Sequence, residues 1–330
     1  MGILYCLLNI KPLTDFFSKT NKPFKLIDEN STTTKFYYKI IQDLLWNFDD
    51  KEDNITKLYI RFMEKNNNIS KINDIFNNIG DLINWLLLEL HNDLLEDNEG
   101  NKVKKYKLFK NFSEMIIQSE KSEKDKKISD FYSDNNTIIR KLFFFELELM
   151  KKCNNIECFK SKINTNKYFS YSFNFLLNVE FNQINEVINK DNRVKLDIYD
   201  LIDYTLNKSV NICEECFQNI KMKRKFYSCP QYFIICINKK INIKYRNKEK
   251  LNIMNYVYNN KNLLCLNETE YEYELISFII DNKTFFCKCP ENNSWYKYEI
   301  ATKPQKIDKL ELILESIPYL LIYKKINNKE

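Results

Sequence analysis

Through about the first 140 residues, apolar side chains recur every three or four positions. This spacing places them on one face of an α-helix. It predicts helices over residues 12–17, 35–48, 54–64 and 79–95. Two charged stretches, 96–105 and 119–127, have the composition of surface loops. We therefore expect the first part of the chain to be largely helical.

From about residue 140 the pattern changes to short runs of aromatic and β-branched residues, which are typical of β-strands. The predicted strands cover residues 169–177, 226–229, 232–237, 273–280, 284–289, 295–298 and 319–323, and a short helix is expected at 196–206. Because helices come first and strands afterwards, the order predicts an α+β fold and not an alternating βαβ one.

Composition supports a globular protein, since 44% of the 330 residues are hydrophobic and 15% are aromatic. The net charge of +6 comes from 51 Lys and Arg against 45 Asp and Glu, with the excess lysine spread along the chain. The single compact basic run, residues 221–225, fits a solvated strand or turn. A nucleic-acid site would instead cluster its charge on one face, so we expect no direct nucleic-acid site.

The N-terminus lacks the basic flank of a secretory signal, and no apolar run approaches the roughly 20 residues that span a membrane. Met1 and Gly2 match the start of a myristoylation signal only weakly, because Cys6 stands where Ser or Thr is preferred. We expect an intracellular protein of the nucleus or cytoplasm without a membrane partner. In such a compartment the ten cysteines stay reduced, and closely spaced pairs indicate metal binding.

Two cysteine pairs have suitable spacing for a metal. Cys213 and Cys216 are separated by two residues, so their thiolates can bind one zinc ion on a hairpin. Cys153 and Cys158 form a looser pair with four residues between them. These four cysteines predict one structural Zn²⁺, and the alternative is a set of reduced thiols without metal.

Several segments, in the same order along the chain, resemble the ubiquitin-specific protease family. These are residues 6–17 (CLLNIKPLTDFF), 80–91 (GDLINWLLLELH), 230–237 (PQYFIICI), and a final group at 273–280, 290–298 and 318–324. They are similar to the segment after the catalytic-cysteine box, a thumb helix, the central strand after the fingers, and the last palm strands. The resemblance spans nearly the whole chain.

This resemblance implies a papain-like cysteine protease fold in a single domain, residues 1–330. Residues 1–140 would form a helical thumb, residues 141–245 the β-rich fingers and the central palm strand, and residues 246–330 the rest of the palm. It also places both cysteine pairs at the tips of the fingers.

Of the three catalytic positions in this family, the resemblance leaves one occupied by a carboxylate. The nucleophilic cysteine would lie eight residues before Cys6, ahead of Met1. The histidine box falls on residues 280–283, so Asn282 occupies the position of the base, and Glu299 occupies that of the third member. An asparagine side chain cannot accept a proton near neutral pH and so cannot act as a general base.

The single histidine of the chain, His91, does not restore this chemistry. The resemblance places it on a thumb helix, at a position that is not catalytic in the family. We expect His91 to pack or cap within the structure.

These features predict a catalytically inactive protein that acts by binding another protein. The partner would be ubiquitin, a ubiquitin-like protein or a spliceosomal protein, because residues 81–87 (DLINWLL) resemble the thumb helix of the family's inactive spliceosomal tri-snRNP branch. The alternative is an active cysteine deubiquitinase whose catalytic-cysteine segment is missing from this reading frame.

Overall fold

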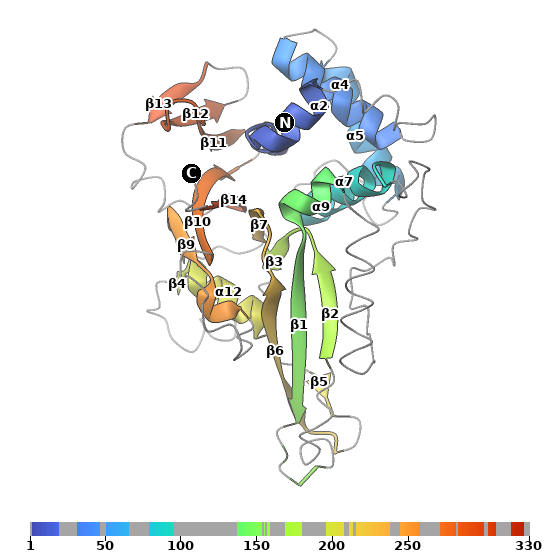
Figure 1. The fold of residues 1–330 in the computed structure, drawn as a ribbon, viewed down its shortest axis with the longest axis vertical. Coiled ribbons are helices and arrows are strands. Elements are labelled where there is room, and N and C mark those ends of the chain that lie inside the picture. Colours follow the sequence, from blue (N-terminus) through green and yellow to red (C-terminus); the bar gives the residue numbers. More distant parts are fainter. Residues whose placement is uncertain are drawn as a thin grey trace.

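The computed structural model describes residues 2–19, 32–46, 51–65, 79–95, 137–153, 155, 157–158, 169–179, 196–207, 211–213, 216–237, 245–257, 271–281, 283–299, 303–307 and 318–326. The loops expected at 96–105 and 119–127 lie outside these residues. The N-terminal helices are α1 (Gly2–Leu8), α2 (Lys11–Lys19), α4 (Thr32–Trp46), α5 (Lys51–Lys65) and α7 (Ile79–Asp93). They lie together at one end of the molecule (Figure 1), which confirms the helical first part.

An eight-stranded sheet forms the palm. Its strands are β3 (Leu177–Val179), β7 (Tyr232–Ile237), β9 (Lys250–Asn252), β10 (Glu272–Ile279), β11 (Thr284–Lys288), β12 (Trp295–Glu299), β13 (Gln305–Ile307) and β14 (Leu320–Lys325). Their order is β13-β12-β11-β10-β14-β7-β3, and β9 pairs with the first residues of β10 on the edge opposite β14. Only β3 and β7 run parallel in this sheet, and the remaining pairs are antiparallel.

A second sheet extends away from the helices and forms the fingers (Figure 1). Its order is β2-β1-β6-β5, from β2 (Phe169–Asn174), β1 (Phe145–Cys153), β6 (Asn219–Ser228) and β5 (Asn211–Ile212). The short helix α9 (Ile138–Phe143) precedes β1. The remaining elements are α12 (Ile198–Leu206), the paired strands β4 (Leu196–Asp197) and β8 (Tyr245–Arg246), and the 3₁₀ helix η1 (Met254–Tyr256).

The palm sheet separates two apolar core clusters. Ile234 and Ile322 belong to the cluster that also contains the thumb helices. Phe233 and Leu321, their neighbours in β7 and β14, belong to the cluster that contains α12. Successive strand residues point to opposite faces of a sheet, so both faces of the central strands are buried. This explains why residues 232–237 read as a continuous apolar run.

The structure differs from the sequence expectation in the strands of the fingers. The expected strand 169–177 is two strands in different sheets, because the chain bends at Phe175 and Leu176 between β2 and β3. Strand β1 was not among the expected strands. Its Glu146 and Glu148 are 0% and 2% exposed, so tertiary packing buries acidic positions that the sequence places among apolar ones. The expected helix at 196–206 begins at Ile198, after β4.

No described helix combines the length and the apolar character needed to cross a membrane.

Candidate functional site

The N-terminal end of α1 lies against the hairpin formed by β10 and β11. A Cβ atom added to Gly2 would be 3.3 Å from a ring carbon of Phe285 and 3.4 Å from the Ile279 side chain. The Tyr5 ring stacks on Phe285, and Phe285 stacks on Tyr298 with ring centroids 5.0 Å apart. These aromatic contacts hold the first thumb helix at the end of the palm sheet where β10 turns into β11.

That turn contains the position assigned to the base. Asn282 itself lies outside the described residues. On either side of it, the Asp281 carboxylate accepts hydrogen bonds from the backbone N–H groups of Lys283 at 2.8 Å and Thr284 at 2.7 Å. An aspartate that bonds its own backbone two residues on forms a defined Asx turn. The Asp281 side chain therefore bridges this turn through two hydrogen bonds.

Tyr319 ties the same turn to the start of β14. Its hydroxyl donates a hydrogen bond to the Asp281 carbonyl at 2.8 Å, and its backbone N–H donates to the Ile279 carbonyl at 2.9 Å. Burial, with a smaller effect of the Asp281 charge, raises the pKa of Tyr319, so the phenol stays neutral and remains a donor. The sequence marked Tyr319 only as a strand residue, and no local pattern pointed to this bond.

Glu299 lies beside the turn through strand pairing. It is the last residue of β12 and pairs directly with Thr284, the first residue of β11. Its carboxylate forms an ion pair with Lys297 on the same strand, and the two side chains are 40% and 35% exposed. An ion pair this exposed contributes little to stability. The strand register therefore brings the third catalytic position to the end of β11 that follows residue 282.

The cysteine thiols with shifted pKa values are all shifted upward. Burial raises the pKa of Cys229 to about 12 and raises that of Cys236 further, where the Asp81 charge adds to the effect. A hydrogen bond with Cys6, together with burial, raises the pKa of Cys287. Because the thiolate is the nucleophile, these upward shifts disfavour the reactive form of the three cysteines at neutral pH.

His91 has the structural role that the sequence predicted. It is 9% exposed, its Nδ1 atom lies 2.6 Å from the Thr137 hydroxyl, and its ring meets Phe175 edge-on at 5.8 Å. Thr137 is also the N-cap of α9 and accepts the backbone N–H of Arg140. Burial, together with the nearby Arg140 charge, lowers the pKa of His91 to about 4. The neutral ring thus joins α7 to the cap of α9.

Three of the four predicted zinc ligands lie together at the tip of the fingers. The Sγ atoms of Cys158, Cys213 and Cys216 all lie within 4.8 Å of one another. The Sγ atoms of Cys158 and Cys213 are 3.7 Å apart. Thiolates bound to one tetrahedral zinc ion, with Zn–S bonds of about 2.3 Å, would be about 3.8 Å apart. The described cysteines therefore fit one zinc ion.

The hairpin of β5 and β6 presents two of these cysteines. The Cys213 backbone N–H donates to the Gln218 carbonyl, and the Phe217 N–H donates to the Cys213 carbonyl, both at 2.8 Å. Phe217 adopts a left-handed φ of 55°, which completes the tight turn after Cys216. The turn leaves the Phe217 side chain 80% exposed.

The other two cysteines belong to the end of β1 and the segment after it. Cys158 is 6% exposed, and its backbone N–H donates to the Asn155 carbonyl at 3.2 Å. Cys153 is the last residue of β1 and pairs with Ile220 of β6. Its side chain lies outside the described residues. The pairing of β1 with β6 therefore brings the end of β1 and the β5–β6 hairpin to the same end of the fingers.

Comparison with protein-family models finds no match, and no curated protein matches the sequence. Solved structures do match. A chain of the yeast SAGA deubiquitinase module, solved with an Sgf73 mutant, has 14% identity and a TM-score of 0.60. A chain of the SAGA Ubp8/Sgf11/Sus1/Sgf73 module bound to ubiquitin aldehyde has 15% identity and a TM-score of 0.56. A chain of this module bound to monoubiquitin has 14% identity and the same TM-score.

Each of these comparisons covers 99% of this chain, and this chain spans about two thirds of the matched chains, 66% or 67% of their length. At such low identity the likeness concerns the fold. It confirms the α+β fold expected from the sequence, with helices and sheets arranged as in the Ubp8-type deubiquitinases. The chain thus has the fold of a ubiquitin-specific protease.

Proposed function

We propose that this protein is a catalytically inactive member of the ubiquitin-specific-protease fold and acts by binding another protein. The observation that carries this proposal is the asparagine at position 282, between β10 and β11 in the sequence, where the family resemblance expects the base. The upward-shifted pKa values of Cys229, Cys236 and Cys287 support it, because these thiols lack the activation that a nucleophile needs. His91 is neutral and bonded to Thr137, so it supplies no replacement base.

Ubiquitin or a ubiquitin-like protein is the partner that the fold supports best. Modules with the same fold have been solved with ubiquitin aldehyde and with monoubiquitin. A fold can keep a protein-binding surface after its catalytic groups are lost, since binding depends on shape and polar contacts rather than on proton transfer. A spliceosomal protein is the second candidate, from the resemblance of residues 81–87 to the inactive spliceosomal branch.

We further propose that Cys153, Cys158, Cys213 and Cys216 hold one structural Zn²⁺ at the tip of the fingers. The three described Sγ atoms are already close enough for a shared ion. The zinc ion would cross-link the β5–β6 hairpin to the segment that follows β1, where the described side chains form a small cluster of Cys158, Cys213 and Cys216.

Reaction with a ubiquitin probe that carries a C-terminal electrophile tests the catalytic part of this proposal. We expect no covalent adduct under conditions that fully label an active deubiquitinase of the same fold. Mass-spectrometric detection of ubiquitin attached to any cysteine would overturn the inactive assignment. It would favour an active deubiquitinase instead.

The binding part has a separate test. We expect the chain to be retained on immobilised ubiquitin and released by free ubiquitin, with an immobilised unrelated protein as the control. Affinity purification from cells, followed by mass spectrometry, then identifies the partner. If the chain is not retained on immobilised ubiquitin and splicing factors co-purify with it, the partner is a spliceosomal protein and not ubiquitin.

A further inference from the structure

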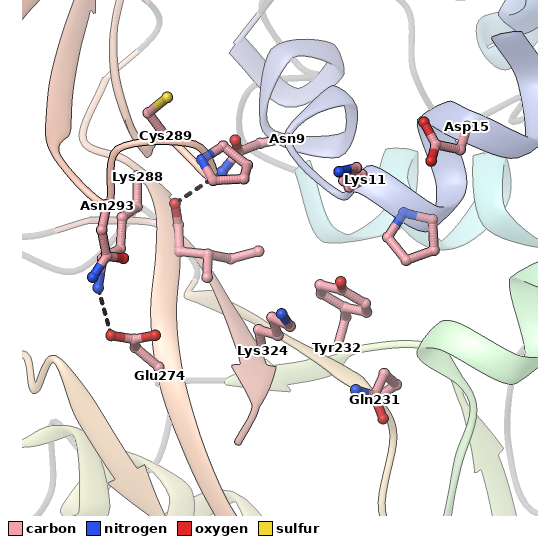
Figure 2. A pocket seen from close by; sticks show the side chains of 13 residues that line it. Asn9, Lys11, Asp15, Gln231, Tyr232, Glu274, Lys288, Cys289, Asn293 and Lys324 are labelled. Atoms are coloured by element: carbon pink, nitrogen blue, oxygen red, sulfur yellow. Dashed lines mark hydrogen bonds and ion pairs between the residues drawn. The ribbon is translucent and has the colours of Figure 1, made fainter. Parts of the chain in front are cut away.

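A cavity of about 520 Å³ lies between the junction of α1 and α2 and one end of the palm sheet. Figure 2 shows Lys11 and Asp15 on the helical side and Tyr232, Glu274 and Lys324 on the strand side. The volume lies within the range of small-molecule sites. The cavity is at the opposite end of β10 from the turn that contains residue 282, so it is distinct from the catalytic positions.

Tyr232 places a hydroxyl group at the wall of this cavity. The residue is only 4% exposed, and its hydroxyl points into the space between the helices and the sheet (Figure 2). No described residue forms a hydrogen bond with this hydroxyl, and the oxygen is not fully buried. Burial raises the pKa of Tyr232, so the group stays protonated and available as a donor. The hydroxyl faces the open space of the cavity, where the oxygen of a bound ligand can accept its hydrogen bond.

Two cationic side chains adjoin this donor. Lys11 and Lys324 line the cavity and are exposed. In the described part of the chain, neither ammonium group forms an ion pair. The third lysine of the lining, Lys288, differs because it pairs with Glu274 and lies 3.8 Å from a Glu249 carboxylate oxygen. The lining therefore offers two uncompensated ammonium groups.

The charges that line the cavity limit how much negative charge a bound ligand can carry. Three lysines line it against the two carboxylates of Asp15 and Glu274, and Lys288 already neutralises Glu274. The lining therefore carries a net charge of +1, three lysines against two carboxylates, and this favours a ligand of low negative charge over a dense polyanion.

The walls of the cavity are held by bonds from both sides. The Asn9 side-chain amide donates to the Ile276 carbonyl at 3.1 Å, which joins the end of α1 to β10. At the rim, Asn293 has a left-handed φ of 57°, and its backbone N–H donates to the Cys289 carbonyl at 2.9 Å. These bonds fix the end of α1 and the turn after β11, which border the cavity.

We propose that this cavity binds a small molecule through an anionic oxygen group, either a phosphate or a carboxylate. The oxygens of that group accept hydrogen bonds from the Tyr232 hydroxyl and from the ammonium groups of Lys11 and Lys324. This proposal is independent of ubiquitin binding.

Isothermal titration calorimetry on the full chain at low ionic strength tests it, with inorganic phosphate, O-phosphoserine and glutarate as probes. The phosphate probes and the dicarboxylate distinguish the two sources of the anionic group. We expect one binding site for at least one probe, with a dissociation constant that rises with added salt.

The variants Tyr232→Phe, Lys11→Met and Lys324→Met should each raise the dissociation constant about tenfold. Lys306→Met on β13, which removes an exposed lysine outside the cavity, is the matched control and should change it less than about twofold. Because Lys11 and Lys324 are exposed, their variants keep the test valid even where Tyr232→Phe disturbs folding. Lack of binding by all three probes, or equal weakening by Lys306→Met, would overturn the proposal.

Discussion

At the scale of single residues, burial lowers the pKa of the His91 side chain and keeps its ring uncharged in the folded protein at neutral pH. Its ring is enclosed between Thr137 and Phe175, and the nearby Arg140 charge acts in the same direction as burial. At neutral pH the folded and unfolded states both hold it uncharged. Because the chain has no second histidine, this one residue is the only side chain with an ordinary pKa between 5 and 8.

We predict a loss of stability in mild acid that depends on His91. Its pKa is about 4 in the folded state against 6.5 for the free side chain, so only the unfolded state takes up this proton between these values. The free energy of unfolding should fall as the pH drops from 6.5 to 4, by about 3 kcal/mol in total from this residue. Urea unfolding of the wild type and His91→Gln across this range checks it. Parallel pH dependence in the two proteins would contradict the prediction.

Tyr319 is the residue that fixes the turn around position 282, through its hydroxyl bond to the Asp281 carbonyl. We predict that Tyr319→Phe lowers the free energy of unfolding by about 1 kcal/mol and speeds hydrogen exchange at the backbone amides of Lys283 and Thr284. Tyr323→Phe is the matched control, because the Tyr323 hydroxyl donates to the Lys248 carbonyl instead. If Tyr323→Phe speeds hydrogen exchange at these two amides as much as Tyr319→Phe does, the prediction that the Tyr319 hydroxyl stabilises the turn is wrong.

Among the elements, the fingers carry the group of cysteines that fits a metal ion in the described part of the chain. Their tip contains the small cluster of Cys158, Cys213 and the partly buried Cys216. The β1–β6 ladder continues to this end, and β5 adds only two residues to the sheet. A metal cross-link would therefore contribute more here than in the palm, where both faces of the sheet are covered.

We predict about one zinc ion per purified chain, measured by elemental mass spectrometry. Cys213→Ser should lower this content strongly and speed hydrogen exchange in β5 and the adjoining end of β6, while the palm strands remain protected. Chelation of the wild type should have the same local effect. Cys289→Ser is the control, because this half-buried cysteine lies outside the cluster. Full zinc content in Cys213→Ser would refute the assigned site.

At the scale of the whole molecule, the described thumb helices share an apolar core with the palm. One apolar cluster contains Leu86 and Phe62 of the helices together with Ile234 and Ile322 of the sheet. The second cluster covers the other face of the same strands. Because the two clusters share the central strands, loss of the sheet exposes both of them.

We therefore predict that thumb and palm unfold in a single transition. Trp85 reports on the first cluster and Trp295 on the second. Trp46→Phe/Trp295→Phe leaves only Trp85 as a fluorescent indole, and Trp46→Phe/Trp85→Phe leaves only Trp295. The urea midpoints from fluorescence should coincide with the midpoint from far-UV circular dichroism in each variant. Separate midpoints would show that thumb and palm unfold independently.

Much of the fold was predictable from local patterns. The three- and four-residue spacing in 79–95 predicted α7, and the apolar run 232–237 predicted β7. The fingers were less predictable. The run 169–177 continues without a turn signal, yet β2 pairs with β1 and β3 pairs with β7. The strands with which β2 and β3 pair decide where the run divides, and the local spacing of apolar residues does not specify these pairing strands.

The amino-acid sequence by itself determined the residue types on which the proposed function rests: asparagine at 282, one histidine, and two closely spaced cysteine pairs. Only the tertiary structure decided where these groups act. It placed Cys158 3.7 Å from Cys213, bonded His91 to a threonine 46 positions away, and enclosed Tyr232 between α1 and the palm. Burial, pKa and ligand geometry depend on neighbours that are distant along the chain, so folding has to bring them together first.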